Sequence, residues 1–224
     1  MKTLYKILSF IVMLLLPFIL IMTAVRLMLS PVFVDVEYYM PGFPPDTYGF
    51  TTTERLKWAH TSVDYLLNNQ GISFLADQQL DANTPLYNER ELSHMQDVKT
   101  LIQTMSSIWI AAIIFGIAIC IWAWRSKWLR YVWSGLSWGG WLTLSLIGAA
   151  LMAVALNFDA LFTDFHHLFF TGDTWLFYYS DTLIRLFPLR FWSDAFIFTG
   201  ALTAIGGLIF ILVGRKMTKK LAAS

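Results

Sequence analysis

Long apolar runs separated by polar segments dominate the pattern of this chain. Four of them cover about residues 7–29, 101–124, 132–156 and 195–213. A helix of about 20 apolar residues spans the hydrocarbon core of a bilayer, so each run is long enough to cross it. The pattern therefore predicts an all-α membrane protein, with four transmembrane helices in a single membrane domain over residues 1–224.

Charged residues are divided by sign between the polar segments. The segments before residue 7, at 125–130 and at 215–220 contain Lys and Arg but no acid, and all fifteen acidic residues lie in 30–100 and 157–194. Short cytoplasmic segments of membrane proteins are enriched in Lys and Arg. We therefore expect both termini in the cytoplasm and the two acidic segments on the extracytoplasmic side.

The composition agrees with a membrane protein and excludes several other classes. Apolar residues make up 57% of the chain, and the net charge of +1 gives no field that would attract nucleic acid. Cys120 is the only cysteine, which excludes an intramolecular disulfide and a CxxC motif. The first apolar run follows Lys2 and Lys6 but is too long for a signal peptide, so it is expected to be retained.

Segment 30–100 contains two helix-start signals. Thr51 with Glu54 has capping-box spacing and precedes an amphipathic helix that is expected to end near Gly71. His60 flanks the apolar stripe of this helix and is expected to pack there. The same spacing recurs at Asn88 and Glu91, which predicts a helix that continues into the second apolar run.

His94 lies on this second predicted helix, three residues from both Glu91 and Asp97. Residues three apart share a helix face, so either acid could fix the tautomer of the imidazole and stabilise its protonated form. The same pattern is also expected of a solvated helix face. The spacing alone leaves both interpretations open.

Segment 157–194 is rich in aromatic residues, which favour the membrane interface. Thr163 or Asp164 could cap a short helix that carries His166 and His167 and ends at Gly172. Because adjacent side chains on a helix point about 100° apart, at most one of these histidines should face a given site. Together, the two acidic segments predict an extracytoplasmic cap of amphipathic and interfacial helices.

Two features of the apolar runs also bear on packing and function. Arg26, near the outer end of the first run, is either a functional intramembrane charge or an arginine that reaches the head groups. Gly135 and Gly139 form a GxxxG pattern that is typical of close helix packing. The chain has no HExxH pair and no P-loop, so histidines, acids and backbone donors are the candidates for chemistry.

The blocks RELSHMQDVK and FHHLFFTGDTWLFYYSDTLIRLFPLRFW, with YGFTTTER, resemble the lipoprotein intramolecular transacylase family of bacterial membrane proteins. The resemblance implies that the sn-2 acyl chain of a diacylglyceryl-modified lipoprotein moves to the α-amino group of its N-terminal cysteine. The product is the N-acyl, S-monoacylglyceryl (lyso) form. The implied partners are these lipoproteins and membrane lipids, with no nucleic acid and no cofactor or metal.

Two catalytic histidines of that family map onto His94 and His166, with His167 as the fallback. The supporting or orienting candidates are Glu91, Asp97, His167, Asp173 and Arg26. We assign His94 as the base that deprotonates the amine, since the nearby acids would stabilise its imidazolium, and a protonated histidine as the donor to the glycerol oxygen.

Two other classes of function remain open on the sequence. His94, Asp97, His166 and His167 could be the ligands of a metal-dependent membrane lipid hydrolase. Alternatively, the chain could be a non-enzymatic subunit of a membrane complex, in which the aromatic segment is an anchor.

Overall fold

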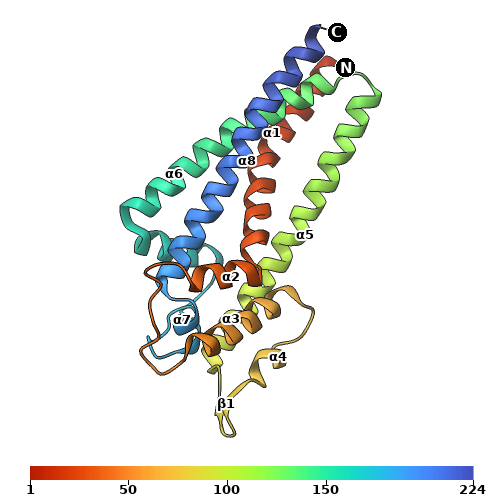
Figure 1. The fold of residues 1–224 in the computed structure, drawn as a ribbon. Helices are drawn as coiled ribbons and strands as arrows, with labels where there is room; N and C mark the ends of the chain where they lie inside the picture. Colours follow the sequence, from red (N-terminus) through yellow and green to blue (C-terminus); the bar gives the residue numbers. More distant parts are fainter. Residues whose placement is uncertain (224) are drawn as a thin grey trace. The chain divides into compact units, whose positions relative to one another are not determined.

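The computed structural model describes residues 1–223 and consists mainly of α-helices (Figure 1). Four long helices are apolar enough to cross a membrane, which confirms the predicted all-α membrane fold. They are α1 (Lys2–Met28), α5 (Glu89–Arg125), α6 (Leu129–Phe169) and α8 (Leu189–Ala223). The shorter elements are α2 (Pro31–Tyr38), α3 (Thr52–Leu67), α4 (Ser73–Ala76), the strands β1 (Gln79–Asp81) and β2 (Thr84–Pro85), and α7 (Thr182–Leu186).

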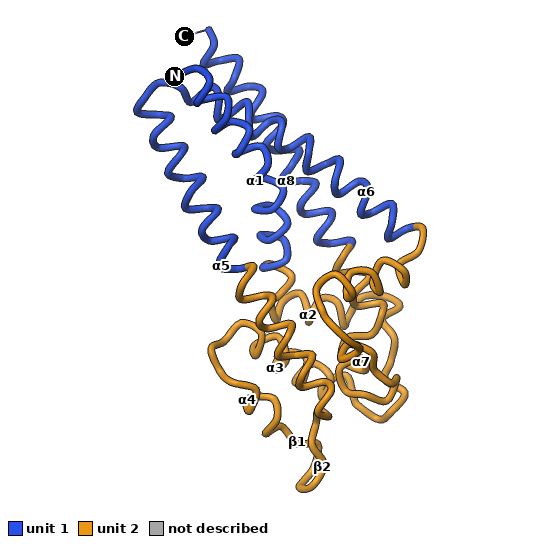
Figure 2. Tube along the Cα trace, turned by 180° about the vertical axis from the view of Figure 1, so that it is seen from behind, with its two compact units in different colours: residues 1–26, 106–155, 197–224 blue, residues 27–105, 156–196 orange. Residues whose placement is uncertain are grey.

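The chain gathers into two compact units (Figure 2). Unit 1 contains Met1–Arg26, Ser106–Ala155 and Ile197–Ser224, and therefore most of the apolar helical residues. Unit 2 contains Leu27–Met105 and Leu156–Phe196. The helices α5 and α6 contribute residues to both units.

Small residues on α6 allow its neighbours in unit 1 to approach closely, as the GxxxG pattern predicts. A side chain at Gly139 would reach within 2.9 Å of the Met13 carbonyl oxygen on α1. On another face of α6, a side chain at Gly140 would reach within 2.5 Å of the Gly207 carbonyl oxygen on α8. The helices α1 and α8 therefore both depend on glycines of α6 for their packing distance.

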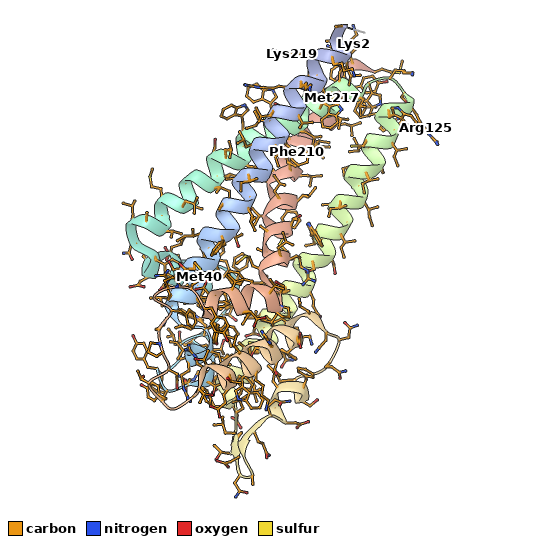
Figure 3. The ribbon with its side chains drawn as sticks, viewed as in Figure 1. Lys2, Met40, Arg125, Phe210, Met217 and Lys219 are labelled. Atoms are coloured by element: carbon orange, nitrogen blue, oxygen red, sulfur yellow. The ribbon has the colours of Figure 1, made fainter. Side chains whose placement is uncertain are left out.

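One end of unit 1 is basic and aromatic. Lys2, Arg125 and Lys219 lie at this end of the unit (Figure 3). The ring of Tyr5 on α1 stacks on that of Trp128 at a centroid distance of 4.8 Å, just before α6 begins. Basic and aromatic residues together are typical of the boundary between hydrocarbon and water.

Unit 2 is built around α3. The side chain of Thr51 accepts a hydrogen bond from the Glu54 backbone, and Glu54 accepts one from Thr51 in return, which confirms the predicted capping box. The inner face of α3 packs in a core that is completed by other segments of the unit. This core contains Trp58, Tyr65, Leu66, Leu75, Leu86, Tyr87, Met95, Leu183 and Leu186.

Two arginines fix the long irregular connection between α2 and α3. Arg55 is buried and donates to the carbonyl oxygens of Pro44 and Arg185 at 2.8 and 2.6 Å. Arg185 in turn donates to both carboxylate oxygens of Asp46 at 3.0 Å. Bidentate pairs of this kind hold both partners in one orientation, so this network connects α7 to the residues ahead of α3.

Several elements differ from the sequence-based expectations. The helix α2 was not predicted, although Ser30 caps it and Pro31 occupies its first turn, a recognised start signal. The amphipathic helix α3 ends at Leu67 rather than near Gly71, because Asn68 already has extended backbone angles. The short hairpin of β1 and β2 was also not predicted; its Asp81 side chain accepts two backbone hydrogen bonds in the turn.

Substitution of Gly140 by alanine tests the close packing of α6 on α8. We expect Gly140→Ala to lower the free energy of unfolding by about 1–3 kcal/mol, since the methyl group would overlap the Gly207 backbone. Gly148→Ala is the matched control, because nothing lies within 4 Å of a side chain there; it should be neutral or stabilising by up to about 1 kcal/mol. Unfolding of both purified variants with increasing amounts of a denaturing detergent measures the difference in their free energies of unfolding. Equal values would contradict this packing.

Candidate active site

His94 is positioned by the start of α5. The side chain of Asn88 accepts a hydrogen bond from the Glu91 backbone, and the Glu91 carboxylate accepts one from the Asn88 backbone at 2.8 Å. This reciprocal cap starts the helix, and α5 then runs without a break to Arg125, as predicted. His94 follows one turn after the cap and is buried, with 8% of its surface exposed.

His166 lies near the end of α6. The stretch of helix that carries it starts at a different residue from the one predicted. Asn157 has φ −163° and ψ 91°, which interrupts the helix, and its side chain accepts a hydrogen bond from the Ala160 backbone at 3.1 Å. Asn157, rather than Thr163 or Asp164, therefore starts the stretch that carries the histidines. The helix ends at Phe169, and Gly172 forms the following turn with φ +76°.

The two histidine rings lie side by side in unit 2, although they are far apart in the sequence. Their centroids are 5.9 Å apart, and the ring planes are inclined by 28°. His166 is as buried as His94. The fold thus brings together the two histidines that the resemblance indicates.

Aromatic side chains surround the histidine pair. Phe170 and Phe177 contact the His94 ring edge-on, at centroid distances of 5.1 and 5.4 Å. Trp175 stacks on His166 at 4.7 Å, and Phe162 lies against the same ring at 4.2 Å. This aromatic wall excludes water and leaves the imidazoles in surroundings of low polarity.

Polar contacts join the start of α5, the helix that carries His94, to the segment around α7. The Glu91 carboxylate accepts a hydrogen bond from the Leu183 backbone at 2.6 Å. Thr182 donates its hydroxyl to the Leu86 carbonyl oxygen, and Asn88 donates its amide to Asp181 at 3.1 Å. These residues at the starts of α5 and α7 come from the two acidic segments of the sequence, so the contacts fix His94 within the fold of unit 2.

Burial keeps both imidazoles neutral near pH 7. It lowers the pKa of His94 to about 4, with a smaller contribution from the neighbouring His166. Burial also lowers the pKa of His166, although its hydrogen bond to the Phe162 carbonyl acts in the opposite direction. The site therefore contains two uncharged proton acceptors rather than one acid and one base.

The tautomer of His166 follows from its hydrogen bond. Its Nδ1 lies 2.7 Å from the carbonyl oxygen of Phe162, and a carbonyl can only accept, so Nδ1 carries the proton. The lone pair is therefore on Nε2. The Nδ1 atom of His94 is buried without a hydrogen-bond partner among the described residues, which leaves Nε2 as the nitrogen that His94 can offer to a substrate.

The other predicted site residues differ from the two histidines in their burial. Asp97 and Asp173 are exposed. The side chain of His167 is also exposed, and its ring contacts Trp175 at 5.4 Å. Arg26 is half-buried in the last turn of α1, in unit 1.

Glu91 does not support His94 as the base in the way that the sequence predicts. Glu91 is buried, and its carboxylate is directed to backbone N–H groups of Asn88 and Leu183. Burial raises the pKa of Glu91 to about 7 against the effect of these hydrogen bonds. Glu91 is thus a positioning residue for α5 and α7 and does not stabilise an imidazolium at His94.

The remaining histidine lies outside this site. His60 packs at the edge of α3, as expected, and its Nε2 lies 2.9 Å from the carboxylate of Asp35 on α2, outside hydrogen-bond geometry. Within residues 1–223, no three His, Cys, Asp or Glu side chains form a cluster suited to a metal. The structure therefore does not bring together the four suggested metal ligands, which are His94, Asp97, His166 and His167.

Sequence reasoning also missed a serine motif on α6. Residues 135–139 read GLSWG and match the GxSxG pattern of hydrolases, whose serine lies on a sharp turn between a strand and a helix. Here Ser137 lies inside α6, is buried, and donates to the Ile211 carbonyl oxygen at 3.4 Å. Ser137 therefore contributes to the packing of α6 on α8 and does not occupy the turn of a hydrolase nucleophile.

Sequence reasoning missed a buried pair of carboxyl groups in unit 2. Glu37 on α2 is fully buried beside Asp194 on α8, and Asp194 also forms an ion pair with Arg190. The pKa of Glu37 is raised to about 7. Burial is the largest cause of this rise, and the interaction with Asp194 is the next largest. Neither Glu37 oxygen has a hydrogen-bond partner among the described residues, so burial and the neighbouring Asp194 together favour the protonated form of Glu37. No motif marks such a pair in the sequence.

These features define a class: an integral membrane protein of long helices with a buried, neutral histidine pair suited to proton transfer. The family model described as "Lipoprotein intramolecular transacylase Lit" matches residues 10–192. The chain therefore belongs to the lipoprotein intramolecular transacylase family and is an acyltransferase. The resemblance noted in the sequence is thereby confirmed.

The chain is also similar in fold to solved structures and in sequence to one curated relative. The membrane integral lipoprotein intramolecular transacylase Lit from Bacillus cereus is 21% identical; the match covers the whole of both chains with a TM-score of 0.79. A variant of it with one histidine replaced by alanine has a TM-score of 0.72 at 20% identity, over 100% of this chain and 97% of that chain. An uncharacterized protein of Aquifex aeolicus (strain VF5) is 28% identical over 216 residues, 93% of this chain and 94% of the relative.

The buried carboxyl pair predicts a pH-dependent stability. Because the pKa of Glu37 is raised from 4.5 to about 7, the folded state binds this proton more tightly, and stability is lost as the pH rises through about 7. The unfolding temperature in detergent should therefore fall between pH 6.5 and pH 8. In Glu37→Gln this fall should be smaller, with a remainder from Glu91.

Glu54→Gln provides the control for this experiment. Glu54 is exposed, and its hydrogen bonds with Thr51 lower its pKa, so it stays ionised throughout this range. The variant should keep the wild-type slope even if the weakened cap lowers the unfolding temperature. An unchanged slope in Glu37→Gln would show that Glu37 does not bind a proton in this range.

Proposed function

We propose that His94 and His166 catalyse transfer of the sn-2 acyl chain of a diacylglyceryl-modified lipoprotein to the α-amino group of its N-terminal cysteine. The observation that supports this most directly is the pair of stacked, buried and neutral imidazoles, one of which has a fixed tautomer. The reaction converts an ester to an amide, so it needs proton transfer and positioning but no external energy source.

His166 acts as the general base in this proposal. Its Nδ1–H is held by the Phe162 carbonyl, which orients the ring as the acidic member of a catalytic triad orients its histidine. Its Nε2 accepts the proton of the amine as the nitrogen attacks the ester carbonyl. A free α-amino group has a pKa of about 8, and low polarity further favours its uncharged, nucleophilic form.

His94 acts as the hydrogen-bond donor to the oxyanion. Because its pKa is about 4, the ring is neutral and can donate through Nε2–H to the oxygen on which negative charge develops. A neutral histidine whose pKa is lowered acts in this way in other enzymes. This assignment replaces the expectation that His94 is the base, since no acid supports an imidazolium there.

Collapse of the tetrahedral intermediate returns the enzyme to its starting state. The C–O bond to the sn-2 glycerol oxygen breaks, and the imidazolium of His166 gives its proton to that oxygen. One N–H is exchanged for one O–H, so no proton is gained or lost. Donor and acceptor are parts of one molecule, and their positioning contributes much of the rate.

The proposed orientation has both termini in the cytoplasm and the histidine site on the extracytoplasmic side. All acidic residues of the chain lie in unit 2 and none in unit 1, while the short basic segments are confined to unit 1. This separation by sign is what the positive-inside rule requires. A diacylglyceryl lipoprotein of the outer leaflet would then meet the site with its acyl chains still in the membrane.

Expression of the chain in a bacterium with diacylglyceryl lipoproteins tests the reaction. The N-terminal lipopeptide should keep its mass, because the transfer is an isomerisation, while its α-amino group loses reactivity toward acylating reagents. Fragmentation should place one acyl chain on nitrogen and leave one on glycerol. A free amine with both ester chains intact would contradict the reaction, and a gain in mass would indicate an intermolecular donor.

Substitutions at the histidines separate the two roles. Loss of the base in His166→Ala should reduce the rate by about 10²–10⁴-fold, and His166→Gln should not restore it, since glutamine is not a base at neutral pH. His94→Ala should reduce the rate by about 10²–10³-fold, whereas His94→Gln should recover at least about tenfold of this because its amide still donates. Fragmentation of the lipopeptide over time measures these rates.

His167→Ala provides the matched control, since its exposed side chain lies outside the pair. It should keep activity near that of the wild type. Equal activities of His94→Ala and His94→Gln would remove the donor role, and full activity of either alanine variant at His94 or His166 would remove that histidine from the mechanism.

A further inference from the structure

We propose that unit 1 binds an anionic phospholipid in a groove between α6 and α8, through its phosphate group. The groove has a volume of about 340 Å³. Its lining includes Ser134, Trp138 and Trp141 of α6 and Arg215, Thr218 and Lys219 of α8. This site belongs to a different unit from the histidine pair, and the proposal does not depend on the catalytic mechanism.

Close packing of the two helices forms the floor of the groove. A side chain at Gly214 would reach within 2.8 Å of the Trp133 carbonyl oxygen and within 2.9 Å of Ser137. The Ser137 hydroxyl hydrogen-bonds to the Ile211 carbonyl oxygen across this contact. The backbones of α6 and α8 thus touch beneath the groove, and the longer side chains form its walls.

The charges in this groove have no partner within their own unit. Unit 1 contains no Asp or Glu anywhere in its sequence. Arg215 and Lys219 lie one turn apart on α8, and neither is in an ion pair within residues 1–223. A pair of neighbouring cations without an acidic partner is a site for an external anion.

A buried hydroxyl gives a second, independent indication of a ligand. The Oγ1 atom of Thr218 is buried and has no hydrogen-bond partner within residues 1–223. Thr218 lies between Arg215 and Lys219 in the sequence and lines the same groove. Rotation of the half-buried Thr218 side chain would present this hydroxyl to a phosphate oxygen, and the phosphate would also pair with the two cations.

The surroundings of the cations favour a lipid over free phosphate. Leu208, Leu212, Arg215 and Lys219 follow one another at helical spacing on one face of α8. Leu208 and Leu212 are 49% and 61% exposed, so an apolar stripe leads directly to the basic pair. This order of apolar and cationic positions matches the acyl chain and phosphate of a phospholipid.

Tryptophan residues complete the recognition of an interfacial head group. Trp138 is 63% exposed, and the Arg215 guanidinium lies over the Trp141 ring at 5.4 Å. Exposed tryptophans of membrane proteins lie at the head-group level. Lys219 marks the basic end of unit 1 in Figure 3, where a phosphate of the adjacent leaflet would be found.

Native mass spectrometry of the purified full chain in detergent tests the proposal with phosphatidylglycerol, phosphatidylcholine and inorganic phosphate as probes. We expect one phosphatidylglycerol to be retained in preference to phosphatidylcholine. The double variant Arg215→Gln/Lys219→Gln should weaken its binding by about tenfold or more, since each basic residue contributes to attraction of an anionic lipid. Thr218→Val should weaken binding by a smaller factor.

The double variant Lys216→Gln/Lys220→Gln is the matched control, because it removes the same charge from the same helix outside the groove. It should bind phosphatidylglycerol as the wild type does. Equal loss in both double variants would show attraction by net charge and overturn the site. Displacement of the lipid by millimolar inorganic phosphate would overturn the choice of a phospholipid as the ligand.

Discussion

The Glu91 carboxylate is the contact on which the geometry of unit 2 depends most. One of its oxygens completes the cap of α5, and the other accepts a hydrogen bond from the Leu183 backbone on α7. The first contact sets the start of the helix that carries His94, and the second joins this helix to the segment around α7. Glu91 is 1% exposed, and its hydrogen bond with the Leu183 backbone is buried, so water does not compete for this contact. Loss of this side chain would leave the buried Leu183 N–H without its acceptor and would release α7 from α5.

Apolar surroundings determine what chemistry the histidines can perform. A nearby acid would raise the pKa of a histidine and favour its charged form, and a cation would repel the ammonium form of the substrate and could not take its proton. The rings of Phe170, Phe177 and Trp175 lower the polarity instead, and both imidazoles remain uncharged. The same surroundings suit a substrate with acyl chains and a neutral amine. Burial of the pair is therefore part of the proposed mechanism as well as of the fold.

Local signals predicted much of the fold, and their limits explain what was missed. The caps at Thr51 and Asn88 and the four apolar runs depend on neighbouring residues only, so spacing reveals them. Both acidic neighbours of His94 were expected to share its face, yet the Glu91 carboxylate bonds to a backbone 92 residues away along the chain. The choice of His166 over His167 depends on where Asn157 interrupts α6, since that sets the rotation of the following turns. Such contacts become visible only when distant segments have been brought together.

The two units differ in how their charged side chains are neutralised. In unit 2, buried acids are compensated within the unit: Asp46 pairs with Arg185, Asp194 pairs with Arg190, and burial raises the pKa of Glu37, which favours its neutral form. Its buried charges are thus compensated internally, as burial demands. Unit 1 has basic side chains and no acidic ones, so its cations can be neutralised only by water, by ions or by the phosphates of lipids. A membrane provides such phosphates at the level where Arg215 and Lys219 end the apolar stripe of α8. For unit 1, the anionic lipid therefore takes the part that Asp and Glu take in unit 2.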